Sequence, residues 1–531
     1  MKATVFPRHE WARFRSRGRL IALAVAVPLI ILFEVLPGLT SWNSCSEGPV
    51  EVPCPTEPRG PDGREISDKF YFVHRPLGRN GSITVRLTSL TGIITYPPPD
   101  HDKLVPGVVP WAKGGVIIKD GTRQGSSYAA LMVTGDHGVR MQYDYVHDTA
   151  GRSGGVSARS PRWLRLTRSG DTITGHESPD GTRWTQVGAA RLPGLPPTAL
   201  IGMFAASPGD LTLRRTGLGA RLPESRFTQA TAVFDSVRVE GAPVAGWSGG
   251  PVGKLGETDW EKYHRAPGLV ESGGTFTISG SGDIGPIPEG GSPESRFLLG
   301  LPLALIIIIT TATRFATTPA RRNSAARPLP AREAKDGPTP ADQPAMSRPQ
   351  PPAAAAREVG GGLVGDGGSL VRRSLVVGVA AGLVGLVSAA VALPVGVALA
   401  PSGGSGFSVI DAGVVVGVAV LTGVAAVLAF AFAALVRRPV VAPLSVTALL
   451  VLPYVVSVVP LLPDEVTRWL LRVTPAAAFA VQQTATEYPQ AVAYYAPMNG
   501  YFPLPGWAGL AVLCAYAAVV LTLAASRHRT S

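Results

Sequence analysis

Six long apolar runs constrain this chain more than any other feature, because each is long enough to form a membrane-spanning helix. A helix needs about 20 mainly apolar residues to cross the hydrocarbon core of a bilayer. The runs occupy residues 20–37, 297–313, 374–400, 409–436, 440–462 and 507–525. No small-residue cleavage site follows the first run, which favours a retained helix over a cleaved signal peptide. The sequence therefore predicts an α-helical membrane bundle of six spans.

The basic residues predict how these spans are oriented. Residues 1–19, the 314–372 linker, the turn at 437–438 and the tail 526–531 are rich in arginine. With six spans, all four segments fall on one side of the membrane, which the positive-inside rule assigns to the cytoplasm. We therefore expect a multi-pass plasma-membrane protein with both termini cytoplasmic and residues 38–295 extracellular. Because topology accounts for the net charge of +12, no nucleic-acid partner is predicted.

The large segment between the first two runs has the pattern of an all-β domain. From about residue 68, short alternating or apolar stretches are separated by Gly, Asp, Asn and Pro. Many short strands with frequent turns are typical of a β-sandwich or jelly roll. Asp180-Gly181, between two such stretches, is a strong hairpin signal. We predict a sandwich over about 65–240 and a second, smaller outer part over 241–295 that leads back to the second span.

Two cysteines stand close together at the start of this outer domain. Cys45 and Cys54 follow the first run, and a nearby pair in an extracytoplasmic segment is typical of a disulfide that closes a short loop. The alternative is two free thiols. The sequence predicts the disulfide.

The two predicted cytoplasmic segments differ in character. Residues 1–19 interleave Phe6, Trp11 and Phe14 with arginines, which favours a basic helix lying in the membrane interface over an ordinary basic flank. Residues 314–372 are rich in Pro, Ala, Gly and Arg and hold few large apolar residues. Such a segment cannot bury a core, so a disordered linker is predicted.

The sequence lacks the common catalytic motifs. The stretch GGPVGKL at 249–255 has Leu255 where a nucleotide-binding loop needs Ser or Thr. None of the eight histidines belongs to a zinc-protease motif or to a convincing Ser-His-Asp set. No paired-carboxylate motif stands out either. We therefore expect no enzyme activity in the chain itself and no cofactor or metal.

Three stretches of the outer domain resemble the concanavalin-like jelly-roll sandwich of lectin-like bacterial domains. They are WAKGGVIIKDG at 111–121, YAALMVTGDHGVRMQYDY at 128–145 and PRWLRLTRSGDTITGHESPDGTRWTQVG at 161–188, and AVFDSVRV at 232–239 resembles the closing strand. The resemblance implies a face that binds extracellular carbohydrate. Candidate glycan-stacking residues are Trp111, Tyr143, Trp163 and Trp184. The alternative is that these rings are core or strand-pair residues.

The helical part resembles the permease subunit of ABC transporters of the exporter-like ABC-2 type, in the form common among actinobacteria. The resemblance is carried by RVTPAAAFAVQQTATEYPQ at 472–490, YYAPMNGYFPLPGWAGLAVLCAYAAVVLTLAA at 494–525, VRRSLVVGVAAGLVGLVSAAVALPVG at 371–396 and HEWARFRSRGRLIAL at 9–23. It implies a homo- or heterodimer of permease subunits driven by a separate ATPase subunit.

The same resemblance implies where that ATPase subunit binds. The coupling elements would be the N-terminal basic helix, with Arg13 and Arg15, and the segment after the second span, with Arg321 and Arg322. Here the chain departs from the family pattern, because a well-formed basic helix is expected after the second span. The rival function is that of a membrane-anchored, lectin-like extracellular binding or sensor protein. An outward-facing glycosidase is a weaker third.

Overall fold

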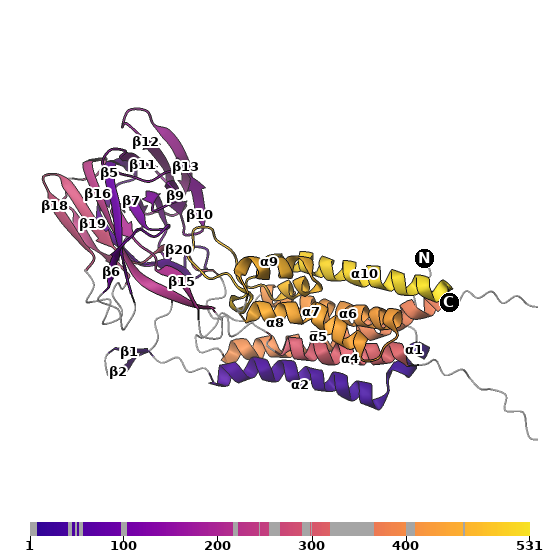
Figure 1. Cartoon of the computed structure of the whole chain (residues 1–531). Coiled ribbons are helices and arrows are strands. Elements are labelled where there is room, and N and C mark those ends of the chain that lie inside the picture. Colours follow the sequence, from indigo (N-terminus) through magenta and orange to yellow (C-terminus); the bar gives the residue numbers. More distant parts are fainter. Residues whose placement is uncertain are drawn as a thin grey trace, which may run out of the picture.

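The protein has two parts, a β-domain and a helix bundle, and the β-domain lies at one end of the bundle (Figure 1). The computed structural model describes residues 8–40, 45–47, 50–52, 57–96, 103–215, 221–243, 245–253, 266–288, 298, 300–318, 366–399, 409–459 and 462–530. We call the end of the bundle next to the β-domain the proximal end and the opposite end the distal end.

Every predicted apolar run forms helix. The long helices are α2 (Arg17–Thr40), α4 (Leu301–Thr317), α5 (Asp366–Leu399), α6 (Val409–Val436) and α10 (Gly506–Thr530), and α7 (Val441–Leu450) with α8 (Leu452–Val458) forms a broken pair. Within the described residues, four stretches are long and apolar enough to cross a membrane: 368–396, 412–436, 441–458 and 506–527. These four indicate a membrane protein. The count of six spans stays a prediction.

Two expectations for the flanking segments are corrected by these boundaries. Within the described part of the basic N-terminal segment, the predicted single helix is interrupted: α1 covers Arg8–Phe14, and a break at residues 15 and 16 separates it from α2, which begins at Arg17. The predicted disordered linker 314–372 begins and ends in helix, because α4 continues to Thr317 and α5 begins at Asp366. The glycines at 367 and 368 did not prevent a helix from forming here, because α5 continues into a long apolar stretch. Residues 319–365, with Arg321 and Arg322, lie outside the described part.

Small residues bring α5 and α6 together. A Cβ atom at Gly385 of α5 would lie 2.3 Å from Thr422 Oγ1 and 2.9 Å from the Val418 carbonyl oxygen of α6. A Cβ atom at Gly423 of α6 would lie 3.0 Å from the carbonyl oxygen of Gly378 in α5. In a membrane, the hydrophobic effect does not drive helices together, because lipid tails are as apolar as the side chains. Small residues then favour association by letting the helix backbones approach closely.

The predicted outer loop 463–506 folds back into the bundle. It forms α9 (Asp464–Val473), then the 3-10 helix η2 (Pro475–Gln482), then the short η3 (Pro497–Asn499). All eight residues of η2 are buried, and η2 packs against α10, α6 and α9. Tyr454 of α8 stacks on Phe479 of η2 with ring centroids 3.7 Å apart. A non-α-helical segment is tolerated inside a bundle because protein surrounds it.

The β-domain is a two-sheet sandwich in which the assigned strand pairs are antiparallel. One sheet has the order β10-β9-β8-β7-β14-β4-β17, and the other has the order β13-β12-β11-β5-β16-β19-β18, with β15 and β6 attached. The strands of the first sheet are β4 (Phe70–Leu77), β7 (Lys113–Lys119), β8 (Tyr128–Thr134), β9 (Val139–Tyr143), β10 (His147–Ala150), β14 (Ala199–Ala206) and β17 (Ser248–Val252). Those of the second are β5 (Asn80–Thr95), β6 (Leu104–Pro106), β11 (Arg162–Ser169), β12 (Thr172–Ser178), β13 (Thr185–Arg191), β15 (Asp210–Arg215), β16 (Arg221–Glu240), β18 (Gly268–Ser272) and β19 (Thr275–Gly280).

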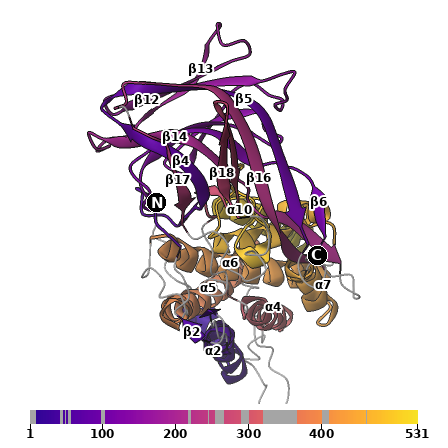
Figure 2. The ribbon, with the colours of Figure 1, turned by 90° about the vertical axis from the view of Figure 1, so that its left-hand side faces the viewer.

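The boundary predicted at residue 240 is wrong, because later strands complete the same sandwich. β17 pairs with β4, and β19 pairs with β16. Their apolar side chains, Val252, Phe276 and Ile278, are buried in the sandwich cores. The strands at 248–252, 268–272 and 275–280 are therefore part of the sandwich and not a separate unit. Figure 2 shows the sandwich beside the proximal end with the helices seen end-on.

Two further pairs of short strands stand outside these two sheets. β1 (Cys45–Glu47) pairs with β2 (Val50–Val52). Cys54 lies outside the described residues, and so does the side chain of Cys45, so the disulfide stays a prediction. β3 (Ile66–Asp68) pairs with β20 (Ile284–Pro286), which are respectively the first and last strands of the sandwich region. We call the β3–β20 pair the clasp.

Candidate functional site

The four candidate glycan-stacking residues do not form one site. Trp111, just before β7, and Tyr143, in β9, belong to the seven-stranded side of the sandwich. Trp163, in β11, and Trp184, just before β13, belong to the other side. A sugar-binding platform made from all four is therefore not assembled.

Each of these rings also has an intramolecular contact. Trp111 is 7% exposed and stacks on His137 at 4.0 Å, and Tyr143 stacks on His147 at 4.2 Å. The guanidinium of Arg165 lies 3.9 Å from the Trp184 ring centroid. The Trp163 ring lies against Gly181, where a Cβ atom would be 2.9 Å away. Gly181 has a φ of +77°, as the predicted Asp-Gly hairpin requires.

The clasp is held on the seven-stranded sheet by two buried ion pairs. Both lysines come from the ends of β7 and neither side chain is exposed. Lys119 Nζ donates to Asp68 Oδ2 at 2.8 Å, and Lys113 Nζ donates to Asp283 Oδ1 at 2.5 Å. Asp68 is in β3 and Asp283 immediately precedes β20. Both strands of the clasp are thus fixed to one central strand of the seven-stranded sheet.

Burial shapes the chemistry of the Lys119 pair. Removal from water lowers the pKa of Lys119, and the charge of Asp68 partly offsets this effect. Burial also raises the pKa of Tyr145, so its phenol stays protonated and donates to Asp68 Oδ2 at 2.8 Å. The backbone amide of Gly125 donates to the same oxygen at 2.9 Å. Asp68 Oδ2 therefore accepts hydrogen bonds from three donors within the protein.

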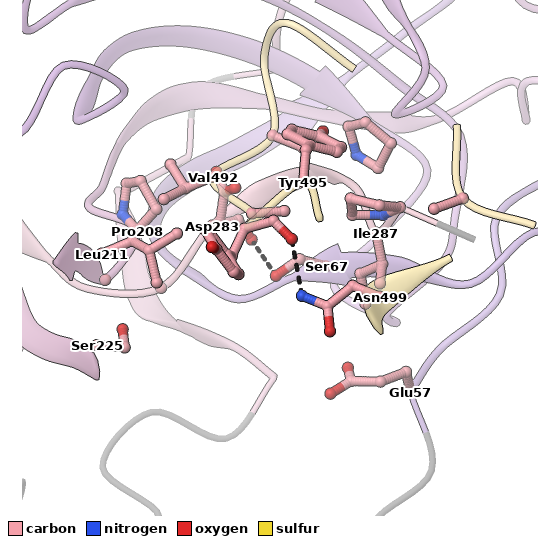
Figure 3. Close-up of a pocket in the computed structure, with 18 of the residues that line it drawn as sticks. Glu57, Ser67, Pro208, Leu211, Ser225, Asp283, Ile287, Val492, Tyr495 and Asn499 are labelled. Carbon is pink, nitrogen blue, oxygen red and sulfur yellow. Dashed lines mark hydrogen bonds between the residues drawn. The ribbon is translucent and has the colours of Figure 1, made fainter. Parts of the chain in front are cut away.

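A cavity of about 560 Å³ lies between the sandwich and the loop that precedes α10. Such a volume falls within the range of small-molecule sites. Figure 3 shows Leu211, Ile287, Val492, Tyr495 and Asn499 around it. The sandwich contributes residues from and beside the clasp, from the β14–β15 turn, and from β15 and β16, and the loop contributes residues 485, 491–495 and 499.

Direct hydrogen bonds outside the cavity lining join the sandwich to the loop. Arg64 Nη1 donates to Tyr488 Oη at 2.7 Å, and Gln490 Nε2 donates to the Val146 carbonyl oxygen at 3.0 Å. On the loop side, Asn499 Nδ2 donates to the Tyr494 carbonyl oxygen at 2.7 Å. Nearby, burial and a hydrogen bond to Glu487 raise the pKa of Tyr501 to about 12. The loop that forms this side of the cavity is thus folded and held by hydrogen bonds.

At the distal end, the side chain of Phe315 contacts residues from three other helices. Phe315 of α4 meets Phe14 of α1 edge-on, with ring centroids 5.3 Å apart. The guanidinium of Arg373 from α5 lies 4.7 Å from the Phe315 ring centroid and donates to the Phe315 carbonyl oxygen at 2.7 Å. The guanidinium of Arg19 from α2 lies 4.9 Å from the same ring centroid. We call Phe14, Arg19, Phe315 and Arg373 the distal cluster.

The distal cluster fixes the position of α1. Arg19 donates to the Arg13 carbonyl oxygen at 3.1 Å, and Arg373 lies 3.9 Å from Glu10 Oε2. Phe14 is 1% exposed. Of the predicted coupling residues, Arg13 pairs with Glu10 at 3.5 Å, and Arg15 is exposed in the break after α1. Among the described residues, exposed arginines at the distal helix ends include Arg15, Arg17, Arg314, Arg372, Arg437, Arg438 and Arg527.

Sequence reasoning missed several of these residues, though some carried a signal. Lys113 and Lys119 flank an otherwise apolar strand, and an isolated charge in such a position must find a partner when buried. Arg373 follows directly on a basic segment, and nothing local distinguishes it from its neighbour Arg372. Nothing local distinguishes Tyr494 and Tyr495 from other loop tyrosines.

Comparisons with known proteins add no family. No family model matches the chain, and no curated protein matches it. A functionally unknown protein from Saccharomyces cerevisiae is similar at 14% identity, covering 32% of this chain and 74% of that chain, with a TM-score of 0.17. Scytalido-glutamic peptidase with a transition state analog inhibitor is similar at 9% identity, covering 40% and 98%, with a TM-score of 0.26. At these TM-scores neither likeness bears on function.

Proposed function

We propose that this chain is the membrane-spanning permease subunit of an ATP-driven ABC transporter. It would have six spans, both termini in the cytoplasm, and a jelly-roll sandwich outside the cell. A separate ATPase subunit would bind at the distal end, and a second permease subunit, identical or related, would complete the pathway. The sequence resemblance of the helical part supports this reading.

The observation that carries the proposal is the packing of α1. A transport subunit must pass the motion of its ATPase partner to its spanning helices. α1 is a separate short helix, and the distal cluster joins it to α2, α4 and α5. Movement imposed on α1 would therefore reach three helices through direct ring and guanidinium contacts. The exposed arginines beside it offer acidic partner groups a charged surface.

The proposed mechanism places no chemistry in this chain. ATP binding and hydrolysis would occur in the partner, and α1 would transmit the movement. In the chain, the sandwich region follows α2 and precedes α4, so the sandwich is covalently attached to the same helices. The rival function, an extracellular binding or sensor protein, is favoured by one observation, the cavity between the sandwich and the loop.

Purification of the tagged full-length chain from its native membranes in a mild detergent tests the proposal. We expect an ATPase subunit to copurify. Arg15→Glu should reduce its recovery by about tenfold, because an exposed charge is reversed at the contact. Arg159→Glu, an exposed position on the sandwich, is the matched control and should leave recovery unchanged. Wild-type protein that brings down no ATPase subunit would contradict the permease function.

A further inference from the structure

The cavity between the sandwich and the loop before α10 has balanced charges. Lys69 Nζ lies 3.9 Å from Glu57 Oε1, and Asp283, also in the lining, is paired with the buried Lys113. Each charged group in the described lining therefore has an opposite charge beside it. A charged ligand would lose hydration on entering and find no unmatched partner, so this lining disfavours ions.

The rest of the lining combines apolar surface with a few polar groups. Leu211 and Ile287 from the sandwich and Val492 from the loop contribute apolar side chains. The loop is folded, yet Val492 remains 38% exposed. Ser67, Ser225 and Asn499 contribute hydroxyl and amide groups to the same space. Apolar walls with a small number of placed polar groups are the usual composition of small-molecule sites.

Two tyrosines lie beside both this cavity and the helices. Tyr494 and Tyr495 line it and also line a small pocket of about 20 Å³ that reaches Ser457 of α8 and Leu471 of α9. The Tyr495 and Tyr501 rings meet with centroids 5.2 Å apart. Tyr494 and Tyr495 are therefore shared between the cavity and a pocket that is lined by residues of α8 and α9.

We propose that this cavity binds an uncharged amphipathic small molecule, with an apolar body and hydroxyl or amide groups. The apolar body would lie against Leu211, Ile287 and Val492, and its polar groups would face Ser67, Ser225 and Asn499. Because the walls belong to different parts of the chain, the ligand would hold the sandwich on the bundle. The site goes beyond the permease function and does not depend on it, since binding requires no ATPase subunit.

Photolabelling of the full-length chain in lipid nanodiscs tests the site. The probe is a hexyl β-glucoside with a diazirine in its alkyl chain, and the comparison probe is the same chain carrying a sulfate. We expect the glucoside to label residues 485–499 and 205–211, unlabelled hexyl glucoside to compete, and the sulfate to label them about tenfold less. Labelling confined to membrane-facing residues of α10 would assign the probe to lipid and overturn the site.

Filling the cavity from either wall provides the variants. Val492→Trp and Leu211→Trp should each reduce labelling by about tenfold, while Val270→Trp, at a residue 66% exposed on β18, should not. Because the two substitutions lie on opposite walls, misfolding of one, detected by size-exclusion chromatography, leaves the other to decide. Equal labelling by both probes, or full labelling of a folded cavity-filling variant, would overturn the proposal.

Discussion

Replacing Lys119 with methionine is expected to destabilise the sandwich by about 3–5 kcal/mol, which is the usual cost of breaking a buried ion pair from one side. Neither Lys119 nor Asp68 has an exposed side chain. Without the ammonium, the Asp68 carboxylate keeps only the neutral donors from Tyr145 and Gly125. A buried ion pair as a whole need not stabilise a protein. Removing one partner is nevertheless destabilising, because the other charge then stays buried without a counter-charge.

Thermal unfolding of the full-length chain in detergent, followed by tryptophan fluorescence, measures this effect. The melting temperature of Lys119→Met should fall by several degrees or more. Adding Asp68→Asn should recover part of the loss, because no full charge then remains buried. Lys103→Met, an exposed position on the sandwich, should change little. An unchanged melting temperature for Lys119→Met would show that the clasp is not held by this pair.

Replacing Gly385 with leucine is expected to disrupt the packing of α5 on α6. The first added carbon would lie 2.3 Å from Thr422 Oγ1, and Thr422 itself donates to the Val418 carbonyl oxygen at 2.9 Å. The helices would have to separate, and overpacking of this kind costs about 1–3 kcal/mol or more. The loss should spread, since α6 also packs against α4 and α10.

Gly413→Leu is the matched control, because a Cβ atom at Gly413 would have no heavy atom within 4 Å. Both substitutions place leucine in α6 or its partner helix, so helix propensity changes equally. We expect Gly385→Leu to lower the melting temperature and the monodisperse fraction after solubilisation, and Gly413→Leu to behave as wild type. Equal behaviour of the two variants would contradict close packing at Gly385.

The sequence predicted those features that depend on local patterns. Apolar length alone located every long helix, and alternation with turn residues located most strands. Gly181 in its hairpin was also foreseeable, because the turn needs a residue that tolerates a positive φ.

What the sequence did not predict depends on contacts between distant segments. The strand at 248–252 pairs with residues 70–74, so nothing local assigns it to the sandwich. The η2 segment is too short for a span and its burial comes from neighbouring helices. The candidate glycan-stacking rings have aromatic or arginine partners that only the folded chain brings near them. The cavity belongs to the same class, since its walls meet only in the folded chain.

The central claim is that the two ends of one bundle face opposite sides of a membrane, with the sandwich outside. Single cysteines at Ser160, exposed on the sandwich, and at Ala12, exposed on α1, test it in a chain that carries Cys45→Ser, Cys54→Ser and Cys514→Ser. In intact cells, a membrane-impermeant maleimide should label Ser160→Cys, and it should label Ala12→Cys only after permeabilisation. Labelling of both positions in intact cells, or of Ala12→Cys alone, would contradict the account.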